Sequence, residues 1–119
     1  MKKTLILGAS SNPHRYSNKA ANRLKAHGHE IVQLGNKISE AAGEKIETGK
    51  PEFKAIDTVT LYVNPGIQKD YYQYLMELKP KRIIFNPGTE NPELQELAQK
   101  NGIETIEACT LVMLSVGNF

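Results

Sequence analysis

Short apolar runs alternate with segments of helical spacing along most of the chain. The apolar runs are continuous and rich in Ile and Val, as is typical of strands that are buried on both faces of a sheet. They predict five strands, at Lys3–Leu7, Glu30–Leu34, Thr58–Val63, Arg82–Phe85 and Glu104–Glu107.

Between three pairs of these strands, apolar side chains recur three and four positions apart, which predicts amphipathic helices. The last of these helices also has a start signal, with Asn91 as N-cap and Pro92 at the first helical position. The helical patterns are Ala20, Ala21, Leu24 and Lys25 before Gly28; Ile67, Tyr71, Tyr74, Leu75 and Leu78 before Pro80; and Leu94, Leu97 and Ala98 before Gly102.

Parallel neighbouring strands need helical crossovers, so this alternation predicts an α/β fold, a single doubly wound domain over residues 1–119. Its sheet would be mostly parallel and flanked by helices on both faces. The segment Ile38–Ile56 departs from the pattern, because Gly43, Gly49 and Pro51 break any long helix. Within it, only 44–48 is predicted as a short edge strand.

The loops that follow four of the strands share a composition of Asn, Pro and Gly. The carboxyl ends of parallel strands meet at one sheet edge, where helix N-termini present free N–H groups and ligands commonly bind. Each loop alone is equally typical of a tight turn, but their shared position predicts a site. These loops carry Asn12-Pro13, Gly35-Asn36, Asn64-Pro65-Gly66 and Asn86-Pro87-Gly88.

The first loop has the small residues that a phosphate site requires. Gly8, Ala9, Ser10 and Ser11 would let a phosphate approach the main chain, and the hydroxyls can donate hydrogen bonds. Three cationic side chains lie near the start of the following helix, although isolated basic residues are also typical of a solvated surface. They are His14, Arg15 and Lys19.

The end of the second strand bears on which nucleotide could bind. A fold that prefers NAD usually places Asp or Glu there to bind the ribose hydroxyls. This chain instead has Leu34-Gly35-Asn36-Lys37. Lys37 suits an additional phosphate on the ribose, which NADP and coenzyme A both carry, and it is equally compatible with an ordinary loop lysine.

Composition narrows the classes of partner. The 119 residues include 15 basic and 13 acidic side chains, a net charge of +2 spread along the chain, which argues against nucleic acid. The single Cys109 excludes an internal disulfide framework, and no apolar run approaches the roughly 18 residues of a membrane helix. We expect a cytoplasmic protein without a membrane partner; a protein partner cannot be read from the composition.

No residue set predicts catalysis or a metal site. Glu93 and Glu96 belong to the outer face of a predicted helix, and Ser10 lacks the surroundings of an activated nucleophile. His27 and His29 bracket a helix end, where a contact with the helix dipole explains a histidine. One Cys and three His do not show ligand spacing. The expected catalytic and metal-binding residues are therefore none.

Five segments carry a family resemblance: LGASSNP, GHEIVQLGN, DTVTLYVNP, FNPGTENPEL and ACTLVML. With these in order, the chain resembles the small bacterial coenzyme A binding proteins, whose Rossmann-like fold also forms the coenzyme A binding domain of the succinyl-CoA synthetase alpha subunit. The family usually has Gly where this chain has Ser17, and Val-Asn-Pro where it has 34–36. The resemblance implies a pyrophosphate turn at Gly8, Ala9, Ser10, Ser11 and Asn12, a ribose phosphate near Lys37, an adenine or pantetheine path along Asn64 and Pro65, and an opposite wall of Pro87, Gly88 and Thr89.

Cys109 follows the last strand and precedes the apolar residues Leu111–Leu114. A packing role is the ordinary interpretation of such a cysteine. Because the family frequently has a Cys at this motif, the resemblance also suggests a mixed disulfide between Cys109 and the thiol of coenzyme A.

The sequence therefore favours a protein that binds coenzyme A or an acyl-CoA without catalysis, in a carrier or regulatory role. The alternative is an NADP-dependent oxidoreductase or an isolated NADP-binding domain. A chain of 119 residues leaves little room for a separate substrate domain, which weakens that alternative.

Overall fold

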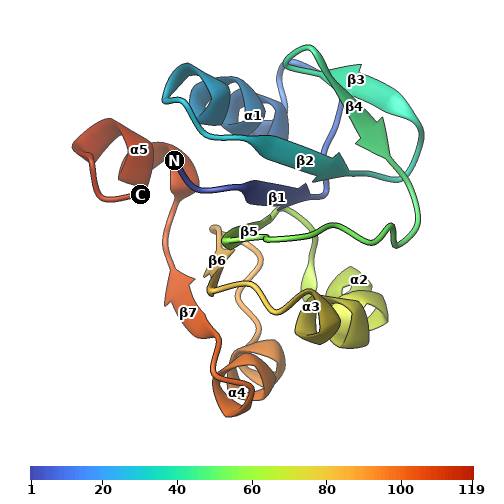
Figure 1. The fold of residues 1–119 in the computed structure, drawn as a ribbon, viewed down its shortest axis with the longest axis vertical. Helices are drawn as coiled ribbons and strands as arrows, with labels where there is room; N and C mark the ends of the chain where they lie inside the picture. The colour runs from blue at the N-terminus through green and yellow to red at the C-terminus, as the bar shows by residue number, and fades with distance from the viewer.

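The computed structural model describes residues 1–119 and contains one seven-stranded sheet with helices on both faces (Figure 1). The sheet order is β3-β4-β2-β1-β5-β6-β7, and only β3 runs antiparallel to its neighbour. The predicted doubly wound α/β fold is confirmed. The strands are β1 (Thr4–Leu7), β2 (Ile31–Leu34), β3 (Ser39–Ala41), β4 (Glu44–Glu47), β5 (Thr58–Leu61), β6 (Arg82–Phe85) and β7 (Glu104–Glu107).

The central strand β1 defines the point where the strand order reverses. The chain leaves β1 toward β2 on one side and later returns to place β5 on the other. The strands end in register, since Leu7 of β1 pairs with Leu34 of β2 and Leu61 of β5, and Leu61 pairs with Phe85 of β6. The loops that follow these four strands therefore start at the same level of the sheet.

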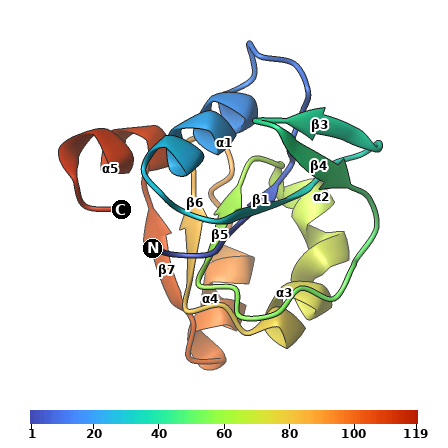
Figure 2. The same ribbon diagram turned by 45° about the horizontal axis from the view of Figure 1, so that its top comes forward.

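Two helical layers enclose the sheet (Figure 2). On one face, Leu24 of α1 and Leu114 of α5 pack with Ile6. On the other face, Leu75 of α3 and Leu94 of α4 belong to a larger buried cluster. No helix is long and apolar enough to cross a membrane. The helices are α1 (Tyr16–Ala26), α2 (Pro65–Gln68), the 3-10 helix η1 (Lys69–Tyr71), α3 (Tyr72–Leu78), α4 (Pro92–Lys100) and α5 (Thr110–Val116).

The helix expected between Ile67 and Leu78 is divided into α2, η1 and α3. The backbone leaves helical geometry at Tyr71, where φ is −111° and ψ is 0°. Although the apolar pattern is helical throughout, Tyr71 faces a cavity at the sheet edge while Leu75 is fully buried in the core. The change of backbone geometry at Tyr71 allows the same segment to line the cavity and to pack in the core.

The segment from β2 to β5 contains a hairpin, which the sequence predicted only in part. The predicted strand at 44–48 corresponds to β4, but β4 is not the edge strand, because β3 pairs along its outer side. Ala42 and Gly43 form the two-residue turn with φ of 55° and 73°, as a tight hairpin requires. The buried side chain of Gln33 donates to the main-chain oxygens of Ala41 and Glu44, which attaches the hairpin to β2.

The apolar residues at 111–114 belong to α5, a helix that was not predicted. A seven-residue helix is too short for its periodicity to stand out in the sequence. Its start is attached to the sheet through Thr110. The Thr110 N–H donates to Asn86 Oδ1 at 2.9 Å, and its hydroxyl lies 2.8 Å from that of Thr60.

Candidate functional site

A cavity of about 960 Å³ lies at the carboxyl ends of β1, β2, β5 and β6. Its 22 lining residues come from the loops and helix starts within 7–17, 34–39, 62–71 and 87–89. These are the four segments whose composition pointed to one sheet edge. The volume is typical of a site for a small molecule or cofactor.

Two glycines allow these loops to approach one another closely. Gly8 has a φ of +101°, and a Cβ there would lie 2.9 Å from the carbonyl carbon and oxygen of Tyr62. A Cβ on Gly35 would lie 2.6 Å from the main-chain oxygen of Ala9. Contacts this short do not occur in folded proteins, so the observed loop packing requires glycine at both positions.

The first loop is shaped by its own polar groups. The N–H of Asn12 donates to Ser10 Oγ at 3.1 Å, and the N–H of His14 donates to Asn12 Oδ1 at 2.9 Å. From α1, Asn18 Nδ2 donates to the main-chain oxygen of Ser10 at 2.9 Å. These bonds hold the turn against the start of α1.

Four main-chain N–H groups of this loop and helix start make no hydrogen bond within the protein. They belong to residues that line the cavity: Ser10, Ser11, Tyr16 and Ser17. The first N–H groups of a helix lack intrahelical partners and carry partial positive charge. This part of the cavity is therefore arranged to receive an anion.

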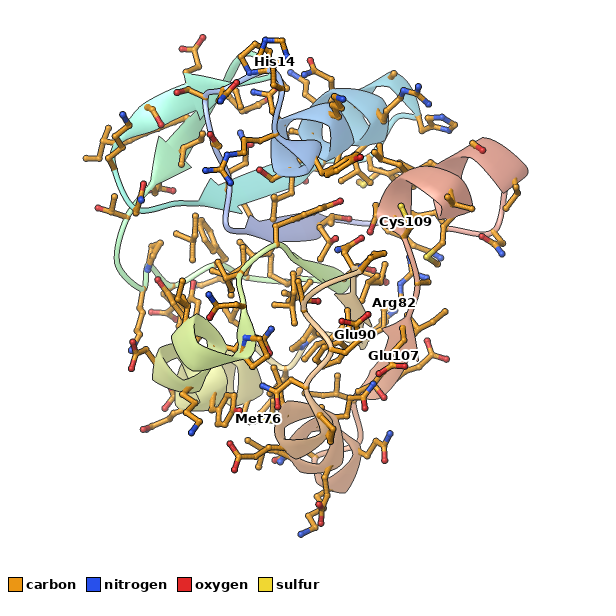
Figure 3. The ribbon with its side chains drawn as sticks, turned by 180° about the vertical axis from the view of Figure 1, so that it is seen from behind. His14, Met76, Arg82, Glu90, Glu107 and Cys109 are labelled. Carbon is orange, nitrogen blue, oxygen red and sulfur yellow. The ribbon has the colours of Figure 1, made fainter.

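The charged side chains around the cavity support the same conclusion. His14, Arg15 and Lys37 line it, whereas none of the 22 lining residues is Asp or Glu. In a chain with 13 acidic residues, their exclusion from the lining leaves a local excess of positive charge. Figure 3 shows His14 on the loop between β1 and α1.

The opposite wall is formed by the loops after β5 and β6. Asn64 caps α2, with its Oδ1 accepting from the N–H of Ile67 at 3.0 Å. Thr89 Oγ1 donates to the main-chain oxygen of Asn86 at 2.8 Å, and the N–H of Gly88 donates to Glu90 Oε1 at 2.9 Å. These polar groups are satisfied inside the protein, so they define the shape of the wall.

Tyr62 lines the cavity between the two walls. Its hydroxyl is buried near Thr60 and Thr110 but has no hydrogen-bond partner. Burial raises the pKa of Tyr62 to about 12, so the side chain is neutral at physiological pH. Its ring contributes a flat apolar surface to the cavity.

Most of the residues expected at the site line this one cavity, and three do not. Asn12 shapes the first turn from outside the lining, Pro65 is the first residue of α2, and Cys109 is the half-exposed N-cap of α5. Figure 3 shows Cys109 where the chain passes from β7 to α5. The expected residues that line the cavity are Gly8, Ala9, Ser10, Ser11, Arg15, Lys37, Asn64, Pro87, Gly88 and Thr89.

The sequence reasoning missed the aromatic and apolar part of the lining. Tyr62 follows the last paired residue of β5, within a run that was assigned as strand. Ile67 and Tyr71 were assigned to the buried face of a helix. An apolar side chain in the sequence can belong either to the core or to the lining of a cavity, so the sequence did not distinguish these residues from core residues. No group of three or more His, Cys, Asp or Glu residues is placed to hold a metal ion.

The fold and the cavity define a single-domain, doubly wound α/β protein of Rossmann-like architecture, with its cavity at the reversal of strand order. The model of the CoA binding domain family matches residues 2–115. The chain belongs to this family.

Solved structures share the whole fold. A crystal structure of an uncharacterized protein is 55% identical, with a TM-score of 0.98 over 100% of this chain and 98% of that one. A conserved hypothetical protein from Pyrococcus furiosus is 26% identical, with a TM-score of 0.81 over 94% and 98%. An oxidoreductase from Bacillus cereus, 14% identical with a TM-score of 0.60 over 89% and 34%, shares the fold alone. No curated protein is significantly similar in sequence.

Proposed function

We propose that this protein binds coenzyme A or an acyl-CoA in the cavity at the carboxyl edge of the sheet, as a carrier or regulatory protein without chemistry of its own. The observation that carries the proposal is that four residues with unbonded N–H groups, Ser10, Ser11, Tyr16 and Ser17, line a cavity that contains no carboxylate. Membership of the CoA binding domain family supports it.

The diphosphate of the ligand is assigned to the first loop. The unbonded N–H groups at the start of α1 and the hydroxyls of Ser10 and Ser11 would donate to its oxygens. Arg15 would add a charge-assisted hydrogen bond. Gly8 and Ala9 contribute by their small size, which leaves the main chain open to approach.

Lys37 is assigned to the phosphate on the ribose. It lines the cavity after β2, is exposed, and forms no salt bridge with another residue. The pantetheine arm is assigned to the wall formed by Asn64 together with Pro87, Gly88 and Thr89. The apolar surfaces of Ile67 and Tyr71 suit the uncharged methylene and amide groups of that arm.

NADP remains the second candidate, since Lys37 suits its ribose phosphate too. An NADP-dependent enzyme also needs a place for a second substrate and groups that transfer protons. The lining offers no carboxylate for that role, the Tyr62 hydroxyl, with its pKa at about 12, is a poor proton donor, and the imidazole of His14 is exposed on the first loop. We therefore rank coenzyme A first.

Titration calorimetry of the full chain with coenzyme A, acetyl-CoA, NADP and NAD tests this proposal. We expect coenzyme A and acetyl-CoA to bind at least about tenfold more tightly than either nicotinamide nucleotide, a difference of about 1.4 kcal/mol. A preference for NADP would reverse the ranking, and heats indistinguishable from dilution for all four ligands would refute the proposed function.

A further inference from the structure

Gln68, the last residue of α2, is a fully buried polar side chain beside the cavity and does not line it. Its Nε2 donates to the main-chain oxygen of Val63 at 2.8 Å and to that of Thr89 at 2.9 Å. Its Oε1 accepts from Asn91 Nδ2 at 2.8 Å. Both N–H groups and the carbonyl of the side-chain amide are therefore used.

The two carbonyls that Gln68 binds belong to two neighbouring loops of the same cavity wall. Val63 lies in the loop after β5 and Thr89 in the loop after β6, and both residues line the cavity. The strand pairing of β5 with β6 ends at Leu61 and Phe85, so no ladder hydrogen bond joins the two loops at this level. The amide of Gln68 joins them instead, as a link between segments that the sheet leaves apart.

A second layer of hydrogen bonds fixes this link in place. Asn91 caps α4 through the N–H of Leu94 at 3.3 Å and donates to the Tyr72 hydroxyl at 2.9 Å. The Tyr72 hydroxyl in turn donates to Glu93 Oε1 at 2.9 Å. The network thus connects α2, α3 and the start of α4, and a satisfied buried network of this kind favours one geometry over its alternatives.

We infer that Gln68 is a positioning residue that holds the 63–67 and 87–89 loops together, and thereby sets the affinity for the pantetheine arm of the ligand. This inference rests on the proposed function. Gln68 acts through the loops it joins and does not touch the ligand. The nucleotide half of the site, at 8–17 and 34–39, shares none of these hydrogen bonds.

The test compares coenzyme A with 3′-phospho-ADP, which has the same nucleotide but lacks the pantetheine arm. Gln68→Met keeps the length of the side chain and removes all three hydrogen bonds. We expect it to weaken coenzyme A about tenfold and to change 3′-phospho-ADP by less than about twofold, because in the proposed binding mode only the arm contacts these two loops.

Gln33→Met is the matched control. Gln33 is also a buried glutamine, 1% exposed, and its Nε2 also donates to two main-chain oxygens, those of Ala41 and Glu44. Those bonds attach the β3–β4 hairpin and do not join the 63–67 and 87–89 loops. We expect Gln33→Met to leave the affinity ratio of the two ligands unchanged, even if it lowers the melting temperature as much as Gln68→Met does.

Equal losses for both ligands in Gln68→Met, or the same change of ratio in Gln33→Met, would show that Gln68 is only a structural residue and would overturn the inference. If Gln68→Met does not fold, Gln68→Leu takes its place, since it also removes all three hydrogen bonds and introduces no charge. The titration of the wild-type chain tests the proposed function. If the wild type does not bind coenzyme A, the proposed function is refuted, and this inference with it.

Discussion

The two walls of the cavity differ in the hydrogen bonds of their side chains, although both contain unbonded main-chain N–H groups, those of Val63 and Asn64 on the second wall included. At the first loop and the start of α1, the N–H groups of Ser10, Ser11, Tyr16 and Ser17 are left without partners. Across the cavity, Gln68, Asn64 and Asn91 satisfy the groups around them. A helix start favours an anion and a satisfied side-chain network favours one shape, so we expect the first wall to supply affinity for an anion and the second to supply fit.

Gly8→Ala should have the largest effect of the substitutions considered, because Gly8 begins the loop after β1 that forms the first wall. The new Cβ meets the Tyr62 carbonyl at 2.9 Å and forces a residue other than glycine to adopt a φ of +101°. We expect the free energy of unfolding to fall by about 3 kcal/mol. Coenzyme A affinity should fall more than about tenfold. Chemical denaturation and calorimetry measure the two effects.

Gly88→Ala is the matched control for this experiment. Gly88 has a similar φ of +92° and lies on the second wall, but a Cβ there meets nothing within 4 Å. Only the backbone strain remains, about 1 kcal/mol. Equal destabilisation by the two substitutions would show that the close approach between Gly8 and Tyr62 contributes nothing.

Lys37→Ala should have the next largest effect. It should weaken coenzyme A about fivefold and its 3′-dephospho form by less than about twofold, because only coenzyme A carries the ribose phosphate that the ammonium would bind. The difference should shrink in high salt. Lys45→Ala, which removes an exposed lysine outside the lining, is the control. Equal losses for the two ligands would remove the proposed role of Lys37.

Tyr62→Phe should change stability more than binding. The substitution removes a buried hydroxyl that lacks a partner and keeps the ring that lines the cavity. We expect the free energy of unfolding to rise by about 1 kcal/mol, with coenzyme A affinity within about twofold of the wild type. A clear loss of affinity would mean that the hydroxyl binds the ligand or an ordered water beside it.

Cys109→Ser should have the smallest effect, because Cys109 lies outside the lining. With reduced coenzyme A, affinity should stay within about twofold. With the disulfide of coenzyme A, the Cys109 thiolate would attack one sulfur, form a protein–coenzyme A disulfide and release the second coenzyme A as a thiol. Intact-mass spectrometry should show one adduct on the wild type and none on Cys109→Ser. Identical spectra would refute the mixed disulfide.

Much of the fold was predictable because its signals are local. The continuous apolar runs at 3–7 and 82–85 identify strands buried on both faces, and Asn91-Pro92 marks a helix start through its capping chemistry. Strand β3 and helix α5 were missed, since three-residue and seven-residue elements are too short for a periodic pattern. Both depend on contacts with distant residues, such as Gln33 with Ala41 and Thr110 with Asn86.

The sequence by itself determined the alternation of strands and helices, the single domain and the edge of the sheet where polar loops meet, because each follows from spacing and turn chemistry along the chain. Only the tertiary structure decided which loop groups stay unbonded, that no carboxylate reaches the lining, and that Gln68 binds both Val63 and Thr89, the latter 21 positions away. These properties depend on how separate segments pack, and no local pattern encodes the distance between them.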